Sequence, residues 1–159
     1  LFIVFSKLII SNMEEKKRPR AGFGVMLLKD NKVLLGHRHE DPIKASSDLH
    51  GEGTWTMPGG KLDFHEKLTD GAVREILEET SIQLDKEKLQ VISISDEMVP
   101  DNHYVTVGFL CTEFEGDPKV MEPDEITEWK WFSLDALPEK VFPPSAKMIK
   151  AFLNKKIYN

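Results

Sequence analysis

The sequence predicts an α+β fold in which a mixed β-sheet lies between helices. Segments with the composition of strands outnumber those with helical spacing, and the helical segments come late in the chain. The chain has 159 residues, 40% of them hydrophobic, which is enough for one domain with one substantial core but too short for two. We therefore expect a single domain over residues 21–159, preceded by an N-terminal extension over residues 1–20.

The extension opens with the apolar segment "LFIVFSKLIISN", which is not typical of a targeting sequence. No basic region precedes it, Lys7 interrupts it, and it has about half of the ~20 apolar residues that span a bilayer. We expect neither a signal peptide nor a membrane anchor. An upstream extension before an alternative start at Met13 is favoured over an extra edge strand or a dimer contact.

The first part of the domain predicts a β-hairpin, a loop and a brief strand. The segments "AGFGVMLL" and "KVLLGHR" are rich in valine and leucine, and Asp30 and Asn31 lie between them as turn residues. The polar segment "DPIKASSDLHGEG" is expected to be a loop. The strand in "TWTMPGG" should end at Pro58, Gly59 and Gly60, because proline and two glycines favour a turn.

The later part predicts a helix, three strands and a terminal helix. The residues after Thr69 have helical spacing, and "LQVISIS", "HYVTVGFLCTEF" and "EWKWFSL" have strand composition. The terminal segment "PSAKMIKAFLNKK" has helical spacing. Its apolar face is expected to carry Met148, Ile149, Phe152 and Leu153.

Charge and cysteine content exclude some classes of function. The formal net charge of −6 argues against general binding to nucleic acid polymers, which requires a basic surface. An acidic protein that binds phosphates must supply positive charge locally, through metal ions or a few lysines and arginines. Cys111 is the single cysteine, so no internal disulfide can form, and the reducing cytoplasm is the expected location.

The helix after Thr69 carries an unusual concentration of like charge. Ala72, Val73, Ile76 and Leu77 form an apolar stripe, whereas Glu75, Glu78 and Glu79 lie together on another face. Like charges at these spacings cost roughly 0.2–0.5 kcal/mol per pair. An ordinary amphipathic helix with glutamates in water tolerates this cost, so the helix alone does not establish a site.

The turn before this helix adds ligands of the same chemical kind. The backbone carbonyls of Gly59 and Gly60 can face the same cavity as the glutamates, and Mg²⁺ or Mn²⁺ prefers such oxygen-only ligands. Arg74 can hold the carboxylate of Glu75, which leaves Glu75 free to take a proton from water rather than bind metal. The sequence therefore predicts a divalent-metal site with an adjacent general base.

These residues resemble the signature motif of a known family. Gly60, Glu66 and the segment "REILEETSI" from Arg74 to Ile82 are similar to the Nudix box, G-x5-E-x7-R-E-U-x-E-E-x-G-U, where U is aliphatic. Every defined position matches except Ser81, where the pattern has the glycine that ends the helix. The resemblance to MutT-type Nudix hydrolases extends from Ala21 to about Phe152. It implies the Nudix fold, an α/β/α sandwich.

The resemblance also implies the metal ligands. Glu78 and Glu79 would bind Mg²⁺ or Mn²⁺, together with the carbonyl of Gly59 or Gly60. Family members usually add one acid from a later loop, and in the segment "MEPDEITEW" we favour Glu125. The other candidates there are Glu122, Asp124 and Glu128.

The remaining residues of the box have implied catalytic roles. Glu75 would act as the general base or as a further metal ligand, and Arg74 would orient it. Glu66 would support the water shell or bridge to Arg74. Arg38 and Lys61 are candidate phosphate contacts, since hydrolysis of a diphosphate requires its charge to be neutralised. Aromatic residues could stack on a base, and the candidates are Trp55 and Tyr104, then Phe23, Trp129 and Trp131.

The family implies hydrolysis of a small nucleotide, and three hypotheses about its function remain open. The first is Mg²⁺-dependent hydrolysis of a standard or modified nucleoside (deoxy)triphosphate to the monophosphate and pyrophosphate. The second is cleavage of ADP-ribose or another nucleoside diphosphate-linked compound. The third is a binding module without turnover, which the complete set of Arg74, Glu75, Glu78 and Glu79 disfavours. No nucleic acid polymer or membrane is expected as a partner, and a homodimer stays open.

Overall fold

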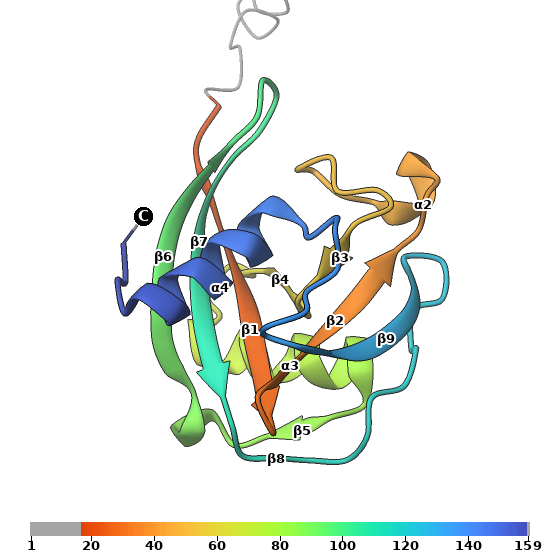
Figure 1. Ribbon diagram of the computed structural model, residues 1–159. Helices are drawn as coiled ribbons and strands as arrows, with labels where there is room; N and C mark the ends of the chain where they lie inside the picture. Colours follow the sequence, from red (N-terminus) through yellow and green to blue (C-terminus); the bar gives the residue numbers. More distant parts are fainter. Residues whose placement is uncertain (1–16, 159) are drawn as a thin grey trace, which may run out of the picture.

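The structure is a computed structural model that describes residues 17–158, and it has a mixed sheet at its centre (Figure 1). In this range the main sheet has seven strands, with β3-β2-β1-β7-β6 as neighbours, β4 paired with β1, and β9 paired with β2. β1 and β7 are parallel, whereas the other pairs are antiparallel. The strands are β1 (Arg20–Lys29), β2 (Lys32–Arg38), β3 (Trp55–Thr56), β4 (Gly59–Lys61), β6 (Gln90–Met98), β7 (His103–Cys111) and β9 (Ile126–Ser133).

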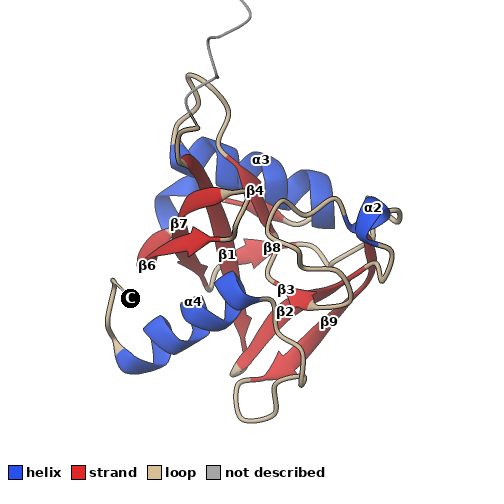
Figure 2. Ribbon diagram, turned by 90° about the horizontal axis from the view of Figure 1, so that it is seen from above, coloured by secondary structure: helices blue, strands red, loops and turns tan. Residues whose placement is uncertain are grey.

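Two longer helices cover the sheet from opposite sides (Figure 2). Helix α3 (Leu68–Thr80) packs on one face and α4 (Pro143–Asn154) on the other. The predicted α+β class with a mixed sheet between helices is therefore confirmed. The shorter described elements are α2 (Pro42–Ala45), η1 (Lys86–Lys88) and the pair β5 (Gln83–Leu84) and β8 (Phe114–Glu115).

The central strand β1 is buried on both faces, which explains its nearly continuous apolar sequence. Phe23, Val25 and Leu27 belong to the core cluster on the α3 side, which also includes Ala72 and Ile76 of the helix. The alternate residue Met26 belongs to the cluster on the α4 side, with Met148 and Ile149. This alternation follows from the two-residue period of a strand.

The hairpin between β1 and β2 forms as predicted. Asp30 and Asn31 have φ of 51° and 58°, the left-handed values that a two-residue type I′ turn requires. Beyond the turn β1 and β2 pair only at Leu28–Val33 and Lys29–Lys32, and then separate. β1 continues with β4 and β7, and β2 with β9 and β3, so the candidate site lies between two separating strands.

The structure differs from the sequence-based expectations at several places. A short helix, α2, interrupts the predicted polar loop, because Asp41 caps it and Pro42 suits its first turn. Gly59 and Gly60 pair with β1 as part of β4 instead of only ending a strand. Leu77 and Leu153, predicted for apolar helix faces, are 47% and 56% exposed, since the buried faces centre on Ile76 and Met148.

The predictions about the N-terminal extension fall almost entirely outside the described residues. The apolar segment lies within residues 1–16, so its predicted roles stay predictions. β1 begins at Arg20, one residue before the expected domain start, because Arg20 pairs with Tyr104 of β7. Among the described helices, none has the length and apolar character needed to cross a membrane.

Candidate active site

A cleft of about 530 Å³ lies where β1 and β2 separate. Its walls come from β1, the loop after α2, the segment from β3 to β4, the acidic face of α3, the loop before β9 and the start of α4. It therefore brings together segments from Gly22 to Met148. Most of the residues that the sequence singled out lie in or next to this cleft.

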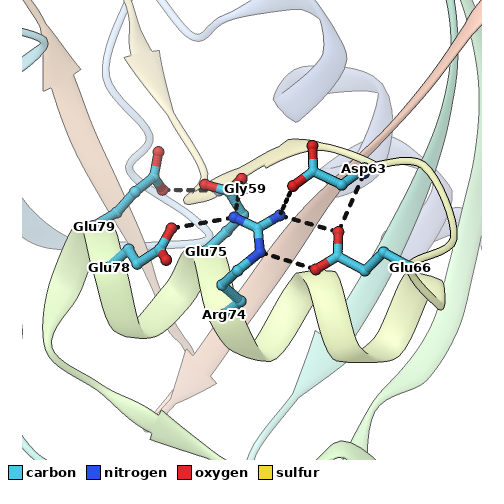
Figure 3. A network of polar contacts seen from close by, with 7 residues as sticks. All are labelled: Gly59, Asp63, Glu66, Arg74, Glu75, Glu78 and Glu79. Carbon is cyan, nitrogen blue, oxygen red and sulfur yellow. Dashed lines mark hydrogen bonds and ion pairs between the residues drawn. The ribbon is translucent and has the colours of Figure 1, made fainter.

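Arg74 organises the glutamates of the box (Figure 3). Its Nε and Nη2 donate to the two carboxylate oxygens of Glu66, at 2.8 and 3.0 Å, which is a bidentate pair. Its Nη1 donates to Glu75 at 2.8 Å and to Glu78 at 3.1 Å. One guanidinium thus holds three carboxylates, and these hydrogen bonds raise the pKa of Arg74 above its usual value.

Glu66 is an anchor for Arg74 and does not line the cleft among the described residues. The hydrogen bonds from Arg74 lower the pKa of the Glu66 carboxyl, and the Asp63 backbone N–H adds to this effect. The two sequence alternatives for Glu66 were a role in the water shell and a bridge to Arg74. The structure shows the hydrogen-bonded bridge between Glu66 and Arg74.

Glu79 is the most strongly perturbed acid of the site. Burial raises its pKa to about 8, and repulsion from Glu75 and Glu122 acts in the same direction. Its Oε2 accepts a hydrogen bond of 3.0 Å from the backbone N–H of Gly59. Burial also raises the pKa of Glu75, although Arg74 opposes the shift. Both carboxylates would ionise more readily if positive charge were placed between them.

The backbone fixes glycine at position 59, and a side chain at position 60 would displace the Glu75 carboxylate. Gly59 has a φ of 155°, and a Cβ at this position would lie 2.3 Å from the backbone oxygen of Phe23. A Cβ at Gly60 would lie 2.5 Å from the carboxyl carbon of Glu75. The absence of side chains here lets the backbone of β4 approach the acidic face of α3.

The donor set fits a divalent cation in its chemistry. Within residues 17–158, no three His, Cys, Asp or Glu side chains converge closely enough to form a metal site as they are placed. Glu75 and Glu78 are turned towards Arg74, and Glu79 towards Gly59. Hard carboxylate oxygens gathered on one wall of a cleft are nevertheless the ligands that Mg²⁺ or Mn²⁺ favours.

Two later acids reach the cleft, whereas the sequence favoured one. Glu122 and Glu125 both line it, but the other two candidates, Asp124 and Glu128, do not. Glu122 raises the pKa of both Glu75 and Glu79, so it lies electrostatically close to the box. Burial raises its own pKa, with further contributions from Glu125 and Glu78.

Arg38 and Lys61, the two predicted phosphate contacts, differ in how far their side chains are already bound by other residues. Arg38 lines the cleft, its Nη2 donates to the backbone oxygen of Ala45, and its Nε has no partner among the described residues. Burial lowers the pKa of Arg38, although the charges of Glu125 and Glu79 oppose this. Lys61 also lines the cleft, but its Nζ is 2.8 Å from Asp48.

The two favoured aromatic residues lie in different places. Tyr104 lines the cleft and its hydroxyl donates to Asp48 at 2.6 Å. Trp55 does not line the cleft in the described part of the chain. Its ring packs against His37 and Phe132, with centroid distances of 4.9 and 4.7 Å. The structure therefore does not bring Trp55 to the base-stacking position that the sequence suggested.

Sequence reasoning missed Asp48 and Ser145, which also line the cleft. Asp48 lies in the segment predicted only as a polar loop, and no spacing pattern marks it. Ser145 is buried at the start of α4, where its Oγ accepts a hydrogen bond of 2.9 Å from the backbone N–H of Met57. A serine after two prolines is a signal for a helix start but not for a cleft.

Comparisons with known proteins agree with this geometry. Residues 18–152 match the model of the NUDIX domain family. The chain is 29% identical over 154 residues to an ADP-ribose pyrophosphatase of Methanocaldococcus jannaschii, covering 94% of this chain and 85% of that protein. It is 31% identical over 105 residues to an 8-oxo-dGTP diphosphatase of Proteus vulgaris, covering 66% of this chain and 86% of that protein.

A solved structure shows the same fold. The crystal structure of a MutT NUDIX hydrolase from Burkholderia pseudomallei superposes with a TM-score of 0.75 at 30% sequence identity. The match covers 85% of this chain and 98% of the other. The chain therefore belongs to the NUDIX family, as a MutT-like Nudix hydrolase that acts on nucleoside diphosphate-linked substrates.

Proposed function

We propose that the protein hydrolyses a nucleoside (deoxy)triphosphate, standard or chemically modified, to the monophosphate and pyrophosphate, with Mg²⁺ or Mn²⁺ as cofactor. The observation that carries this proposal is the placement of Glu79 and Arg38 in one cleft. A buried carboxylate with a raised pKa and a buried guanidinium lie close enough to influence each other's ionisation. Opposite charges on a cleft wall suit a cation and the phosphates that it accompanies.

The chain's own residues have separable roles in this reaction. Glu78 and Glu79 would hold the divalent ion, with the Gly59 or Gly60 carbonyl and with Glu122 or Glu125 as the later acid. The bound ion supplies charge neutralisation and makes water more acidic. Glu75, fixed by Arg74, would take the proton from the attacking water, and Glu66 would keep Arg74 in place. The water oxygen would bond to one of the two phosphorus atoms of the α–β anhydride, the bond from that phosphorus to the bridging oxygen would break, and the monophosphate and pyrophosphate would leave.

A second substrate class has its own support. The relative named ADP-ribose pyrophosphatase aligns with 94% of this chain, so a nucleoside diphosphate linked to a sugar remains a candidate. The same carboxylates would serve, because the bond cleaved is again a diphosphate anhydride. A binding module without turnover is disfavoured, since Arg74 and its glutamates are retained in full at the cost of mutual repulsion.

Two further elements of the proposal concern partners and location. We infer a free nucleotide rather than a nucleic acid polymer as substrate, because the net charge of −6 opposes binding to a phosphate backbone. The buried, unpaired Cys111 is consistent with the reducing cytoplasm. A homodimer stays an open alternative.

A substrate panel with product analysis tests the proposal. Standard and oxidised nucleoside triphosphates are compared with ADP-ribose in the presence of Mg²⁺, and the products are identified by phosphorus NMR. We expect monophosphate and pyrophosphate from a triphosphate. Orthophosphate as the first product would indicate a phosphatase, and exclusive turnover of ADP-ribose would establish the second candidate instead.

A further inference from the structure

Asp48 lies on the opposite side of β4 from the carboxylate cluster. Gly60 and Lys61 are neighbours in β4, so their side-chain directions point to opposite faces of the sheet. The Gly60 position faces Glu75, whereas the Lys61 side chain reaches Asp48 at 2.8 Å. Both groups line the cleft, with the glutamates on one side of β4 and Asp48 on the other, and we refer to the second region as the Asp48 end of the cleft.

Asp48 is held firmly through only one of its two carboxylate oxygens. Its Oδ2 accepts from the Tyr104 hydroxyl at 2.6 Å and lies 2.8 Å from Lys61 Nζ and 3.2 Å from Arg20 Nη1. The Asn102 side chain donates to the Asp48 backbone oxygen at 3.0 Å, which fixes the loop itself. Among residues 17–158, Oδ1 has no hydrogen-bond partner, and the side chain is 32% exposed.

The charges at this end favour the nucleoside rather than the phosphates. Lys61 and Arg20 are both paired with Asp48, whereas Arg38 has no carboxylate bound directly to it among the described residues and lies within the electrostatic influence of Glu125 and Glu79. The hydrogen bonds from Lys61 and Tyr104 lower the pKa of Asp48, so the carboxylate stays ionised at neutral pH. An ionised carboxylate only accepts hydrogen bonds, and it repels a carbonyl oxygen placed against it.

We propose that Asp48 Oδ1 accepts a hydrogen bond from an amino group on the substrate's base, which makes Asp48 a specificity-determining residue. The inference rests on the proposed nucleotide hydrolysis and names the substrate class. Cytosine and adenine present an amino group where uracil and hypoxanthine present a carbonyl oxygen. The enzyme therefore prefers amino-bearing bases over their oxo counterparts.

Two matched substrate pairs test this preference in the wild-type protein. The value of kcat/KM is measured for dCTP against dUTP and for dATP against dITP, since each pair exchanges the amino group for an oxygen and moves the remaining donor to the neighbouring ring nitrogen. We expect the amino member of at least one pair to be favoured about tenfold or more, as for a hydrogen bond to a charged group. Ratios near one for both pairs overturn the inference, whatever any variant does.

Variants separate base recognition from a merely structural role of Asp48. Asp48→Asn keeps the shape of the side chain but can donate a hydrogen bond. The ratio of kcat/KM for the amino substrate to that for its oxo counterpart should therefore fall to about one or below. Asp101→Asn is the matched control, because Asp101 binds His50 of the same loop and does not line the cleft among the described residues. It should leave the ratio unchanged.

The outcomes are distinguishable from a failure of the proposed function. An equal loss for all four substrates in Asp48→Asn, with the ratio kept, would show that Asp48 only pins the loop, and the inference would be overturned. Absence of turnover for every triphosphate overturns the proposed function and this inference together. Circular dichroism melting of each variant establishes that the compared proteins are folded.

Discussion

At the scale of single residues, Glu79 joins stability to function. Its pKa is about 8 in the folded protein against an unperturbed value of 4.5, so between these values the folded state binds more protons than the unfolded state. The free energy of unfolding therefore falls as the pH rises through this window. Glu79→Gln removes the titration, and the metal-free variant should be the more stable protein at pH 8 but not at pH 4.5.

We expect a gain of about 1 kcal/mol or more at pH 8 for Glu79→Gln without metal, since one pKa unit corresponds to about 1.4 kcal/mol. Thermal melts in chelator between pH 4.5 and 8 measure it. Glu78→Gln is the control, because Glu78 lies on the same helix but its side chain is 53% exposed. With Mg²⁺ present, Glu79→Gln should lose at least about a hundredfold in kcat while staying folded. Equal pH dependence of wild type and Glu79→Gln would contradict the assignment.

At the scale of elements, the end of α3 shows how one departure from the motif is accommodated. Ser81 has a φ of 64° and donates its N–H to Leu77, the left-handed helix end that glycine adopts most easily. Ser81→Gly should therefore stabilise the protein by about 0.5–1 kcal/mol. For a chain of this length, this corresponds to a rise in Tm of about 1–4 °C.

Ser81→Ala is the matched control, because alanine keeps the strained φ and removes only the hydroxyl. It should not raise the Tm. The glutamates proposed to be catalytic are unchanged in both variants, so kcat should remain within about twofold of wild type. A Tm for Ser81→Gly at or below that of wild type would show that the helix end tolerates serine without strain.

A second element-scale contact joins α4 to the sheet. Ser145 Oγ accepts the backbone N–H of Met57, and both residues are buried. Ser145→Ala leaves this N–H without its partner, which should cost about 1–3 kcal/mol. Ser145→Thr retains the hydroxyl and serves as the control for the hydrogen bond, although its extra methyl group must fit at the cleft wall. Chemical denaturation measures both, and an unchanged midpoint for Ser145→Ala would contradict the role of the hydrogen bond.

At the scale of the whole molecule, local patterns predicted most of the fold. Asp30 and Asn31 mark their turn by chemistry, and alternating burial explains the apolar run of β1, so these features can be read without tertiary structure. The exposure of Leu77 and the place of Asp48 in the cleft could not be predicted from local patterns. Helical spacing does not determine whether a residue at the edge of the buried face, such as Leu77, is exposed. Asp48 is held by Lys61 and Tyr104, which are distant from it in sequence.

The candidate site likewise has residues that local sequence patterns predict and residues that only the tertiary structure places. Helical spacing predicted that Glu75 and Glu78 lie together, because residues on one helix have a fixed relation to one another. Glu66 precedes the helix, so its bridge to Arg74 was expected only from the family resemblance. The later acid was less determined, since Glu122 and Glu125 both reach the cleft from a loop whose path no periodicity specifies. Trp55 was placed at the substrate by composition alone, whereas packing against His37 and Phe132 holds it elsewhere.

The proposed metal dependence involves residues from the whole cleft and can be tested in two independent ways. Activity should require millimolar Mg²⁺ or Mn²⁺ and disappear in excess chelator, because the carboxylates are oxygen ligands. The same ion should raise the Tm of wild type, since a ligand that binds only the folded state stabilises it by about 2.7 kcal/mol at a hundred times its Kd. A cation in the cleft would offset the cost of burying the charges of Glu75 and Glu79, and then their repulsion with Glu122, which is the physical source of this gain.

The rise in Tm should be much smaller in Glu79→Gln and unchanged in Glu113→Gln. Glu113 is a matched acid that is 69% exposed and pairs with Lys88 away from the cleft, so it controls for a general effect of charge. Full activity in chelator would reject the metal-dependent reaction. An equal rise in Tm for all three proteins would mean instead that the ion acts at other sites, and the assignment of Glu79 as a ligand would have to be withdrawn.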